Sequence, residues 1–386
     1  MRFSTALSIL ALLAVPVAPQ NTTANTTALT ELVQQLQSLG LTSFINATTV
    51  VNQTSTGQSL LASLGSGPQT VFAPNNDAWA GALPNVTASA ESLAEVLSYH
   101  VVPGTFNTTA TYPNTTIGRT LLNSSDVVFL EGNKRQVLAW SDQSGTITIL
   151  NQNTPNIVVN STTVGNITVH VTTAVIDYPG DLEAALFANN LTSFTTALQN
   201  ASLLDTLNRQ HGVTIFAPSD AAFAAAQQNL SAAGSNATVL TNVLRNHVIN
   251  GTTVYSGNLI ELGGSNVTTG AGEGLSATFN STGGFVTVGN STAGITTPDI
   301  VLWNGVLHIV DSVLLDSDSD ESAASSAVSS ANAAATSSTT ESGPIGFTPT
   351  PTSAGNVATG SSSSAASNLE IPLSIFGVIL AGALAI

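Results

Sequence analysis

Two stretches far apart in the chain place apolar residues at the i, i+3, i+4 and i+7 positions of a helix. They are Leu93, Val96, Leu97 and His100, and Leu240, Val243, Leu244 and His247. This spacing puts all four side chains on one helix face, so each set predicts a helix with one buried stripe. A further helix is predicted by Leu29, Leu32, Val33, Leu36 and Leu39, and it ends at Gly40, a residue type common directly after helices.

Polar and apolar residues alternate in two other segments, as they do in strands with one buried face. Residues 146–149 read TITI and residues 285–288 read FVTV, with turn residues nearby. Helical patterns dominate the first half of each region, and strand-like patterns dominate the second half. This order predicts α+β domains with a mostly antiparallel sheet.

Three short motifs occur twice, in the same order. Residues 71–79 (VFAPNNDAW) recur as 215–223 (IFAPSDAAF), and residues 97–104 (LSYHVVPG) recur as 244–251 (LRNHVING). Each copy closes on a β-rich segment with one histidine, His170 or His308. The copies lie about 140 residues apart, a spacing too long for a solenoid repeat and typical of tandem globular domains.

These motifs resemble those of the fasciclin domain family: an apolar-Phe-Ala-Pro box, a Tyr-His box that ends a helix, and a closing Asn-Gly-Val-(Ile/Leu)-His strand. Here the closing strand reads NGVLHIVD at residues 304–311 and follows Pro298-Asp299-Ile300. The resemblance covers two domains, 29–177 and 178–316. It implies that each is a β-sandwich wedge with helices along one edge, and that the protein acts in adhesion rather than catalysis.

The chain departs from the family pattern at three places. Asn246 stands where Tyr is usual, Asn156 stands where Asp is usual before Ile157, and the first copy lacks the Asn-Gly-Val turn before His170. The resemblance implies adhesion through domain surfaces and loops. Our candidate adhesion surface consists of Tyr99, His100, Asn246, His247, Asp299 and Ile300.

The N-terminus has the layout of a secretory signal peptide. A basic start at Arg2 precedes an apolar run over residues 6–17 and small residues around Ala18. The run is short for a membrane span, which is the alternative interpretation. We expect a signal peptide at 1–18, with cleavage between Ala14 and Gln20, and then a glycosylated segment at 19–28.

The C-terminus has the layout of a glycosylphosphatidylinositol (GPI) attachment signal. Residues 369–386 form an apolar tail that we expect to be removed, and small residues upstream make Gly360 the attachment candidate within 356–364. A tail-anchor helix is the alternative. Residues 317–368 are rich in Ser and Thr and poor in large apolar side chains, so they predict a disordered, O-glycosylated stalk.

Asn-x-Ser/Thr sequons are dense, which is typical of a glycan-coated exterior protein. The candidate N-glycosylation sites are Asn21, Asn25, Asn46, Asn52, Asn85, Asn107, Asn114, Asn123, Asn160, Asn166, Asn190, Asn200, Asn229, Asn236, Asn250, Asn266, Asn280 and Asn290. Only 7% of the residues are charged, so covalent sugar is an obvious source of solubility.

Charge and cysteine content exclude several classes of protein. A net charge of −16 with only 6 basic residues excludes a nucleic-acid-binding surface and a polybasic segment that binds anionic lipid. The chain has 0 cysteines, so disulfides, thiolate metal sites and cysteine nucleophiles are excluded. We expect contact with the membrane only through a lipid anchor.

The residues that are candidates for chemistry have simpler structural interpretations. We expect His100, His170, His247 and His308 to be core histidines bonded to backbone, rather than metal ligands. Asp77 and Asp220 follow the Phe-Ala-Pro turns and are expected to provide capping oxygens at helix starts. No catalytic motif occurs, so no catalytic residue, metal or cofactor is expected.

Two charged segments have alternative interpretations. Lys134-Arg135 is a dibasic pair that a secretory protease would cut, but its place between strand-like runs favours a hairpin tip. Residues 316–321 imitate the opening of a calcium loop, yet Glu321 and Ala327 stand where Gly and Glu are needed. We interpret them as the acidic start of the stalk.

Together these features predict a secreted, GPI-anchored adhesion or matrix glycoprotein at the cell surface or cell wall, with a layout typical of fungi. Its expected partners are cell-surface or wall glycans and glycoproteins, or another copy of the chain. The alternatives are a structural wall glycoprotein without a receptor, and a module that binds a glycan or small ligand.

Overall fold

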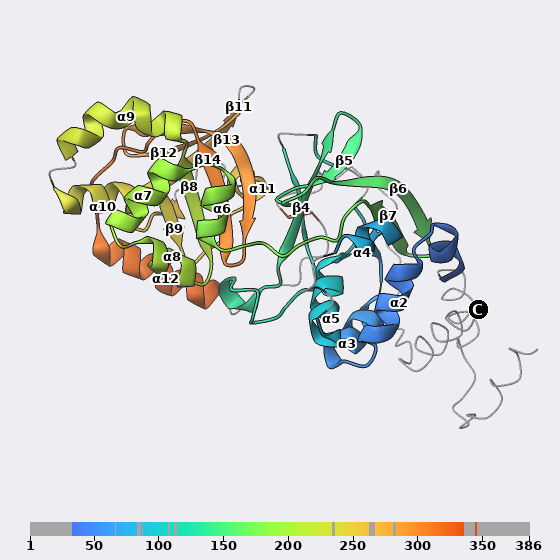
Figure 1. Cartoon of the computed structure of the whole chain (residues 1–386). Helices are drawn as coiled ribbons and strands as arrows, with labels where there is room; N and C mark the ends of the chain where they lie inside the picture. Colours follow the sequence, from blue (N-terminus) through green and yellow to red (C-terminus); the bar gives the residue numbers. More distant parts are fainter. Residues whose placement is uncertain are drawn as a thin grey trace, which may run out of the picture. The chain divides into compact units, whose positions relative to one another are not determined.

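The computed structural model describes residues 33–335, apart from 66, 83–85, 87, 107–108, 112–113, 234–235, 262–266 and 281–282, together with residues 344–345. The predicted signal peptide (1–18), the segment 19–28, Gly360 and the tail 369–386 lie outside these residues. The described chain divides into two compact units: unit 1 contains 33–98 and 159–175, and unit 2 contains 99–158, 176–335 and 344–345 (Figure 1).

Unit 1 packs helices against two parallel strands. Its helices are α2 (Thr42–Val51), α3 (Ser55–Ser63), α4 (Asn76–Ala80) and most of α5 (Ala90–Tyr99). Strand β1 (Gln69–Pro74) is buried along its whole length and pairs in parallel with β7 (Ile167–Thr172). The predicted helix before Gly40 is present over its described residues, and Gly40 takes φ 72° directly after it.

Unit 2 contains the other strands of the first repeat. They are β2 (Val101–Pro103), β3 (Thr116–Arg119), β4 (Val137–Gln143), β5 (Thr146–Ile149) and the start of β6 (Asn156–Val164). Strands β3, β4, β5 and β6 pair antiparallel in that order, with Trp140 opposite Thr116 on one side and Ile149 on the other. The predicted strand at residues 146–149 is therefore confirmed.

The second repeat lies wholly in unit 2 and begins with helices. These are α6 (Leu182–Ala188), α7 (Thr192–Asn200), α8 (Leu204–Arg209), α9 (Asp220–Ala233), α10 (Ala237–Arg245) and, later, α11 (Ser256–Glu261). Strand β8 (Val213–Pro218) precedes α9. The further strands are β9 (Val248–Asn250), β10 (Val267–Thr268), β11 (Gly274–Asn280), β12 (Gly283–Val288), β13 (Ser291–Leu302) and β14 (Gly305–Val310).

These strands form one sheet in the order β10-β11-β12-β13-β14-β8-β9, in which β14 and β8 are parallel and the other neighbouring pairs are antiparallel. Alternate residues of β8 enter two different cores, because successive strand side chains point to opposite faces. Ile215 and Ala217 pack with helices α6, α7 and α8, whereas Phe216 packs with β11, β12 and β13. The α+β class and the tandem arrangement, with a seven-stranded sheet in each repeat, are confirmed (Figure 1).

The first predicted apolar stripe is buried, and so is the second apart from the half-buried Leu240. Leu93, Val96 and Leu97 face inward from α5, and Val243 and Leu244 do so from α10. Each helix ends before its histidine, since α5 stops at Tyr99 and α10 at Arg245. The two histidines therefore continue the stripe from the first residues of the following turn.

The start of the predicted stalk is folded, which corrects the expectation of disorder from residue 317. Residues Glu321–Ala335 form helix α12, because alanine favours helices and the Asp320 carboxylate caps the first turn. Ala324 is buried, and α12 contacts β10 and the 3₁₀ turn η1 (Glu131–Asn133). Further along, Ile345 is also buried, and its N–H donates to the carbonyl of Ile117 in β3.

The predicted hairpin tip at Lys134-Arg135 is not formed. The residues before it, 127–130, are not a strand; they lead into η1, and β4 begins only at Val137. The physical reason is Glu131, whose carboxylate is drawn inward instead of staying at a solvent-exposed turn. Among the described residues, no helix combines the length and apolarity needed to cross a membrane.

Candidate functional site

The histidines after α5 and α10 occupy equivalent places in the two repeats. His100 Nε2 accepts the N–H of Ile176 at 2.9 Å, and His247 Nε2 accepts the N–H of Leu314 at 2.9 Å. The other nitrogen of His247, Nδ1, donates to the Val243 carbonyl at 2.7 Å. Burial lowers the pKa of His247 to about 4, so its ring is neutral at pH 7. These rings fasten the end of each repeat to the turn that follows its helix.

The closing-strand histidines differ between the repeats. His308 is fully buried, accepts the N–H of Asp299 at Nδ1 (3.2 Å) and donates from Nε2 to the Val254 carbonyl (3.0 Å). Its pKa is lowered chiefly by burial, against the opposing effect of Asp299. His170 is only partly buried, and its Nδ1 lies 2.7 Å from the Ser161 hydroxyl. The core-histidine prediction therefore describes His100, His247 and His308 better than His170.

The six side chains of the candidate adhesion surface are all buried, so they do not form an exposed surface and that expectation is corrected. Tyr99 is 2% exposed, Asp299 is 0% exposed and Ile300 is 6% exposed, and His100, Asn246 and His247 are at most 1% exposed. Tyr99 Oη donates to the Val137 carbonyl at 3.0 Å, and burial raises the pKa of this phenol. Each of these polar side chains makes at least one hydrogen bond inside the fold.

Asn246, which replaces the usual tyrosine, fastens the residues after the second repeat. Its Nδ2 donates to the carbonyls of Asp316 (3.1 Å) and Asp318 (3.2 Å), and its Oδ1 accepts the Thr269 hydroxyl at 2.7 Å. A primary amide offers two N–H donors and an acceptor oxygen, whereas a tyrosine hydroxyl has a single O–H donor. The departure from the family pattern thus coincides with an ordered segment 316–320.

The Phe-Ala-Pro boxes do precede helix starts, but the capping residue lies two positions before Asp77 in the first box and one position before Asp220 in the second. Asn75 and Ser219 accept the capping N–H groups of Ala78 and Ala222, whereas Asp77 lies in the first turn of α4. Asp220 instead accepts the N–H of Ser193 at 2.8 Å, at the start of α7.

A polar junction joins the first-repeat strands of unit 2 to the second repeat. Its centre is the buried Asp299 carboxylate, which accepts the hydroxyl groups of Thr115 and Ser256 and the Ser256 N–H at 2.7 Å. The Asp299 carbonyl accepts Nδ2 of Asn151 at 2.9 Å. Asp299 has φ 59°, a conformation that Asp adopts more readily than most residues. Thr115 and Asn151 come from the first repeat, so one carboxylate ties both repeats together.

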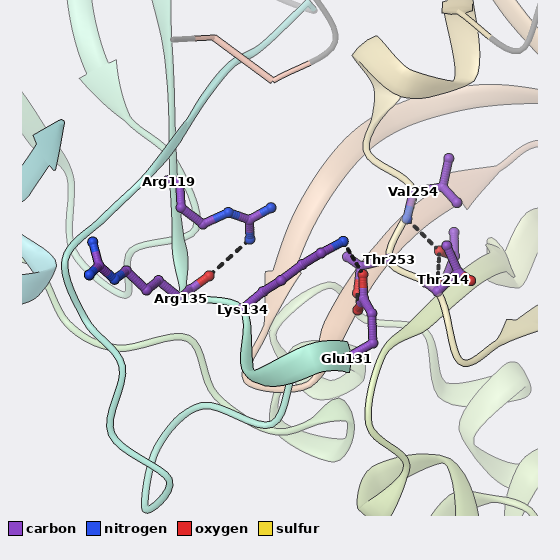
Figure 2. A network of polar contacts seen from close by, with 8 residues as sticks. Arg119, Glu131, Lys134, Arg135, Thr214, Thr253 and Val254 are labelled. Atoms are coloured by element: carbon purple, nitrogen blue, oxygen red, sulfur yellow. Dashed lines mark hydrogen bonds and ion pairs between the residues drawn. The ribbon is translucent and has the colours of Figure 1, made fainter. Parts of the chain in front are cut away.

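A second buried carboxylate lies at the edge of this junction (Figure 2). Glu131 is 4% exposed; its Oε1 pairs with Lys134 Nζ at 2.9 Å and its Oε2 accepts the Thr253 hydroxyl at 2.7 Å. The next residue, Val254, donates its N–H to the Thr214 hydroxyl at 2.8 Å. Lys134 of the dibasic pair is therefore engaged in an ion pair, and Arg119 donates to the Arg135 carbonyl at 2.9 Å.

Hydrogen bonds to backbone carbonyls and apolar contacts also contribute to the junction. Gln136 Nε2 donates to the Leu302 carbonyl at 3.1 Å, and the Phe129 N–H donates to the Trp303 carbonyl at 2.9 Å. The rings of Phe129 and Trp303 lie 4.7 Å apart between centroids. An apolar cluster completes it and consists of Ile117, Val137, Ala139, Tyr255, Val301, Val306 and Ile345.

Sequence reasoning missed Thr115, Glu131, Gln136 and Ser256 as junction residues. Nothing in a lone charged or polar residue inside a loop signals that it meets another domain. The partners of Thr115, Glu131 and Gln136 lie more than a hundred residues away along the chain, and that of Ser256 lies 43 residues away. Chemically the junction offers buried, hydrogen-bonded carboxylates, and the Ser256 hydroxyl beside Asp299 is half-buried. In the part of the chain that the structure describes, no group of three or more His, Asp or Glu residues is placed to hold a metal ion.

The candidate glycosylation sites differ in exposure. The exposed ones are Asn46, Asn114, Asn123, Asn160, Asn166, Asn190, Asn200, Asn236 and Asn290. Asn52 and Asn250 are half-buried, and Oδ1 of each is buried without a hydrogen-bond partner among the described residues. The other side chains are outside the described set: Asn21, Asn25, Asn85, Asn107, Asn229, Asn266 and Asn280.

Comparison with known proteins identifies relatives of both repeats. The family model "Fasciclin domain" matches residues 27–178 and 189–316. A "Fasciclin-like arabinogalactan protein" of Arthroderma benhamiae is 27% identical over 237 residues, which cover 60% of this chain and 53% of that protein. An uncharacterized protein of Synechocystis is 32% identical over 138 residues, 36% of this chain and 98% of its own length. The chain thus spans about half the length of its Arthroderma relative.

Among solved structures, a FAS1 domain pair from the insect cell adhesion molecule Fasciclin I is 16% identical. The alignment covers 72% of this chain and 98% of that one, with a TM-score of 0.34.

Proposed function

Because the chain belongs to the fasciclin domain family, we propose that it is a non-enzymatic surface glycoprotein that presents two tandem fasciclin domains for adhesion. Fasciclin domains are associated with cell adhesion and with cell-wall glycoproteins, and are generally non-enzymatic. The observation that carries the proposal is that the polar side chains of the repeated motifs are bonded inside the fold, as with His247 and Asp299. These side chains stabilise the fold, so we expect partners to bind the exposed loops.

The proposed location is the outer face of the plasma membrane or the cell wall. The signal-peptide pattern at 1–18 and the GPI-signal pattern around Gly360 support this routing. The nine exposed sequons among the described residues are compatible with it, because each can carry a glycan without entering a core. The relative named as an arabinogalactan protein also favours a wall or surface location.

The proposed partners are wall or surface glycans, glycoproteins or a second copy of the chain. The contact surface is the exposed loops, because the buried Tyr99 and His100 are not available to a partner. Two weak sites on one chain would act together through their high effective concentration.

The test displays the full chain on cells that lack it and measures saturable binding to cells, to isolated wall polysaccharide and to beads that carry the same protein. Release by a phosphatidylinositol-specific phospholipase tests the anchor. We expect loop substitutions to abolish binding without changing the unfolding temperature. The buried control Thr115→Val should lower that temperature and leave the affinity unchanged. If the protein binds neither cells, nor wall polysaccharide, nor the beads, and only loss of the anchor weakens the wall, the adhesion proposal fails and a structural role in the wall is favoured.

A further inference from the structure

The turn between α6 and α7 contains an asparagine in the left-handed conformation. Asn190 has φ 56°, its N–H donates to the Phe187 carbonyl at 3.1 Å, and the Leu191 N–H donates to the Leu186 carbonyl at 3.0 Å. This pair of bonds is the Schellman motif, in which the residue after the helix is usually glycine because a side chain is strained there. Asn190 also begins the sequon Asn190-Leu191-Thr192.

The first repeat has the same turn with different residues. Gly40 takes φ 72°, its N–H donates to the Gln37 carbonyl at 3.0 Å, and the Leu41 N–H donates to the Leu36 carbonyl at 3.0 Å. The second repeat therefore differs at two linked positions: asparagine replaces the favoured glycine, and Phe187 replaces Gln37. The fold of the turn requires neither change.

Phe187 is 86% exposed, the highest value among the exposed large hydrophobic residues of the described chain, where Ile260 and Val159 follow at 55%. A single exposed apolar side chain is common on protein surfaces. This one lies three residues before a sequon asparagine and is bonded to it through the turn. The backbone bond of the turn brings these two residues together, and both of their side chains are exposed.

We propose that Asn190 carries an N-linked glycan whose first N-acetylglucosamine packs on the ring of Phe187. This inference rests on the proposed function, because it requires passage through a glycosylating compartment. In the transfer, Asn190 Nδ2 bonds to the anomeric carbon of a lipid-linked oligosaccharide diphosphate. The bond from that carbon to the diphosphate oxygen breaks, the diphosphate leaves, and Nδ2 loses one proton.

The sugar fits the chemistry of the exposed ring. One face of a pyranose presents C–H groups, and these remove apolar ring area from water when they stack on an aromatic face. The covalent link to Asn190 holds the sugar near the ring, so little further entropy is lost on contact. The glycan would thereby stabilise the same turn that the left-handed asparagine strains.

Another described sequon shows the contrast. Asn46 follows Phe44 by two residues, but Phe44 is 6% exposed and belongs to the interior of unit 1. Asn200, at the end of α7, is exposed and follows the fully buried Leu198. Asn200 is therefore the matched control for a glycan without an aromatic neighbour.

The experiment uses the full chain, secreted or released from cells, with glycans trimmed enzymatically to the first N-acetylglucosamine. Thermal unfolding is compared for the parent, Phe187→Ala, Asn190→Gly and the double variant. Asn190→Gly removes the sequon while installing the residue that the first repeat has at Gly40. We expect Phe187→Ala to lower the unfolding temperature by about 2–4 °C when Asn190 carries sugar, and by less than about 1 °C in the Asn190→Gly background.

The control is the same cycle with Asn200→Gln, in which Phe187→Ala should have the same effect in both backgrounds. Equal effects of Phe187→Ala with and without the Asn190 glycan would overturn the inference. Mass spectrometry of glycopeptides distinguishes a failure of this inference from a failure of the proposed function. Sugar at other sequons with Asn190 bare refutes this inference alone, whereas no sugar at any sequon also refutes the proposed glycoprotein.

Discussion

Replacement of Ile345 by alanine tests whether the chain beyond the second repeat is part of the folded unit. Ile345 is 7% exposed, packs in the apolar cluster of the junction, and donates its N–H to Ile117 in β3. Ile345→Ala removes three buried carbon groups, worth about 0.8 kcal/mol each, which gives about 2.4 kcal/mol. A cavity that does not collapse brings the expected loss to about 2–4 kcal/mol.

The assay is denaturant unfolding of the full chain, followed by far-UV circular dichroism and by tryptophan fluorescence. The same substitution at Ile260, which is 55% exposed on α11, is the matched control and should cost less than about 0.5 kcal/mol. Equal, small losses for both variants would show that residues 344–345 do not dock at the junction. The folded part of the predicted stalk would then be α12 alone among the described residues.

Three further predictions concern the buried polar groups. Thr115→Val removes a hydroxyl donor from the buried Asp299 carboxylate and should lower the free energy of unfolding by about 1–3 kcal/mol in a denaturant titration. Glu131→Ala should cost about 1–3 kcal/mol because Thr253 loses its acceptor, whereas Glu131→Gln keeps an acceptor and should cost under about 1 kcal/mol; equal losses would refute this ranking. The pKa of His247 is about 4 in the folded protein and about 6.5 in the unfolded chain, so between these pH values only the unfolded state binds a proton on this ring. The free energy of unfolding should therefore be highest above pH 6.5 and fall by up to about 1.4 kcal/mol per pH unit between pH 6.5 and 4. A His247→Gln variant should show a shallower fall in a denaturant titration over the same pH range.

Buried carboxylates at the junction link the two repeats. Asp299 and Glu131 each accept hydrogen bonds from the other repeat, through Thr115 and Thr253 respectively. Removing these donors from a buried carboxylate costs free energy, because the charge then stays out of water without hydrogen bonds. The second repeat and the strands β3–β5 of the first therefore unfold as one cooperative unit in our expectation.

Much of the fold could be predicted from local patterns. The stripe Leu93, Val96 and Leu97 identified α5, and the alternation at 146–149 identified β5, because helix and strand periods are properties of the backbone itself. The duplicated motifs identified tandem domains for the same reason, since each copy repeats the same local rules. The Ser-rich composition of residues 317–335 predicts disorder, although the alanines there favour the helix α12 that the structure shows.

The candidate site could not be predicted in the same way. The Tyr-His box and Asp299 place polar residues in recurring motifs, but a sequence does not show whether a polar side chain points to solvent or to a buried partner. For Asp299 the partners are Thr115, in the loop before β3, and Ser256, the first residue of α11.

By itself, the sequence determined the α+β class, the duplication, the buried helix stripes and the positions of the sequons, all of which depend on neighbouring residues. Only the tertiary structure decided that Tyr99 and His247 are interior residues, that Glu131 turns inward, and that Ile345 returns to the junction. The physical reason is that burial and hydrogen bonding are satisfied by groups distant in the chain. The free energy of those contacts depends on which segments meet, a property of the folded chain as a whole.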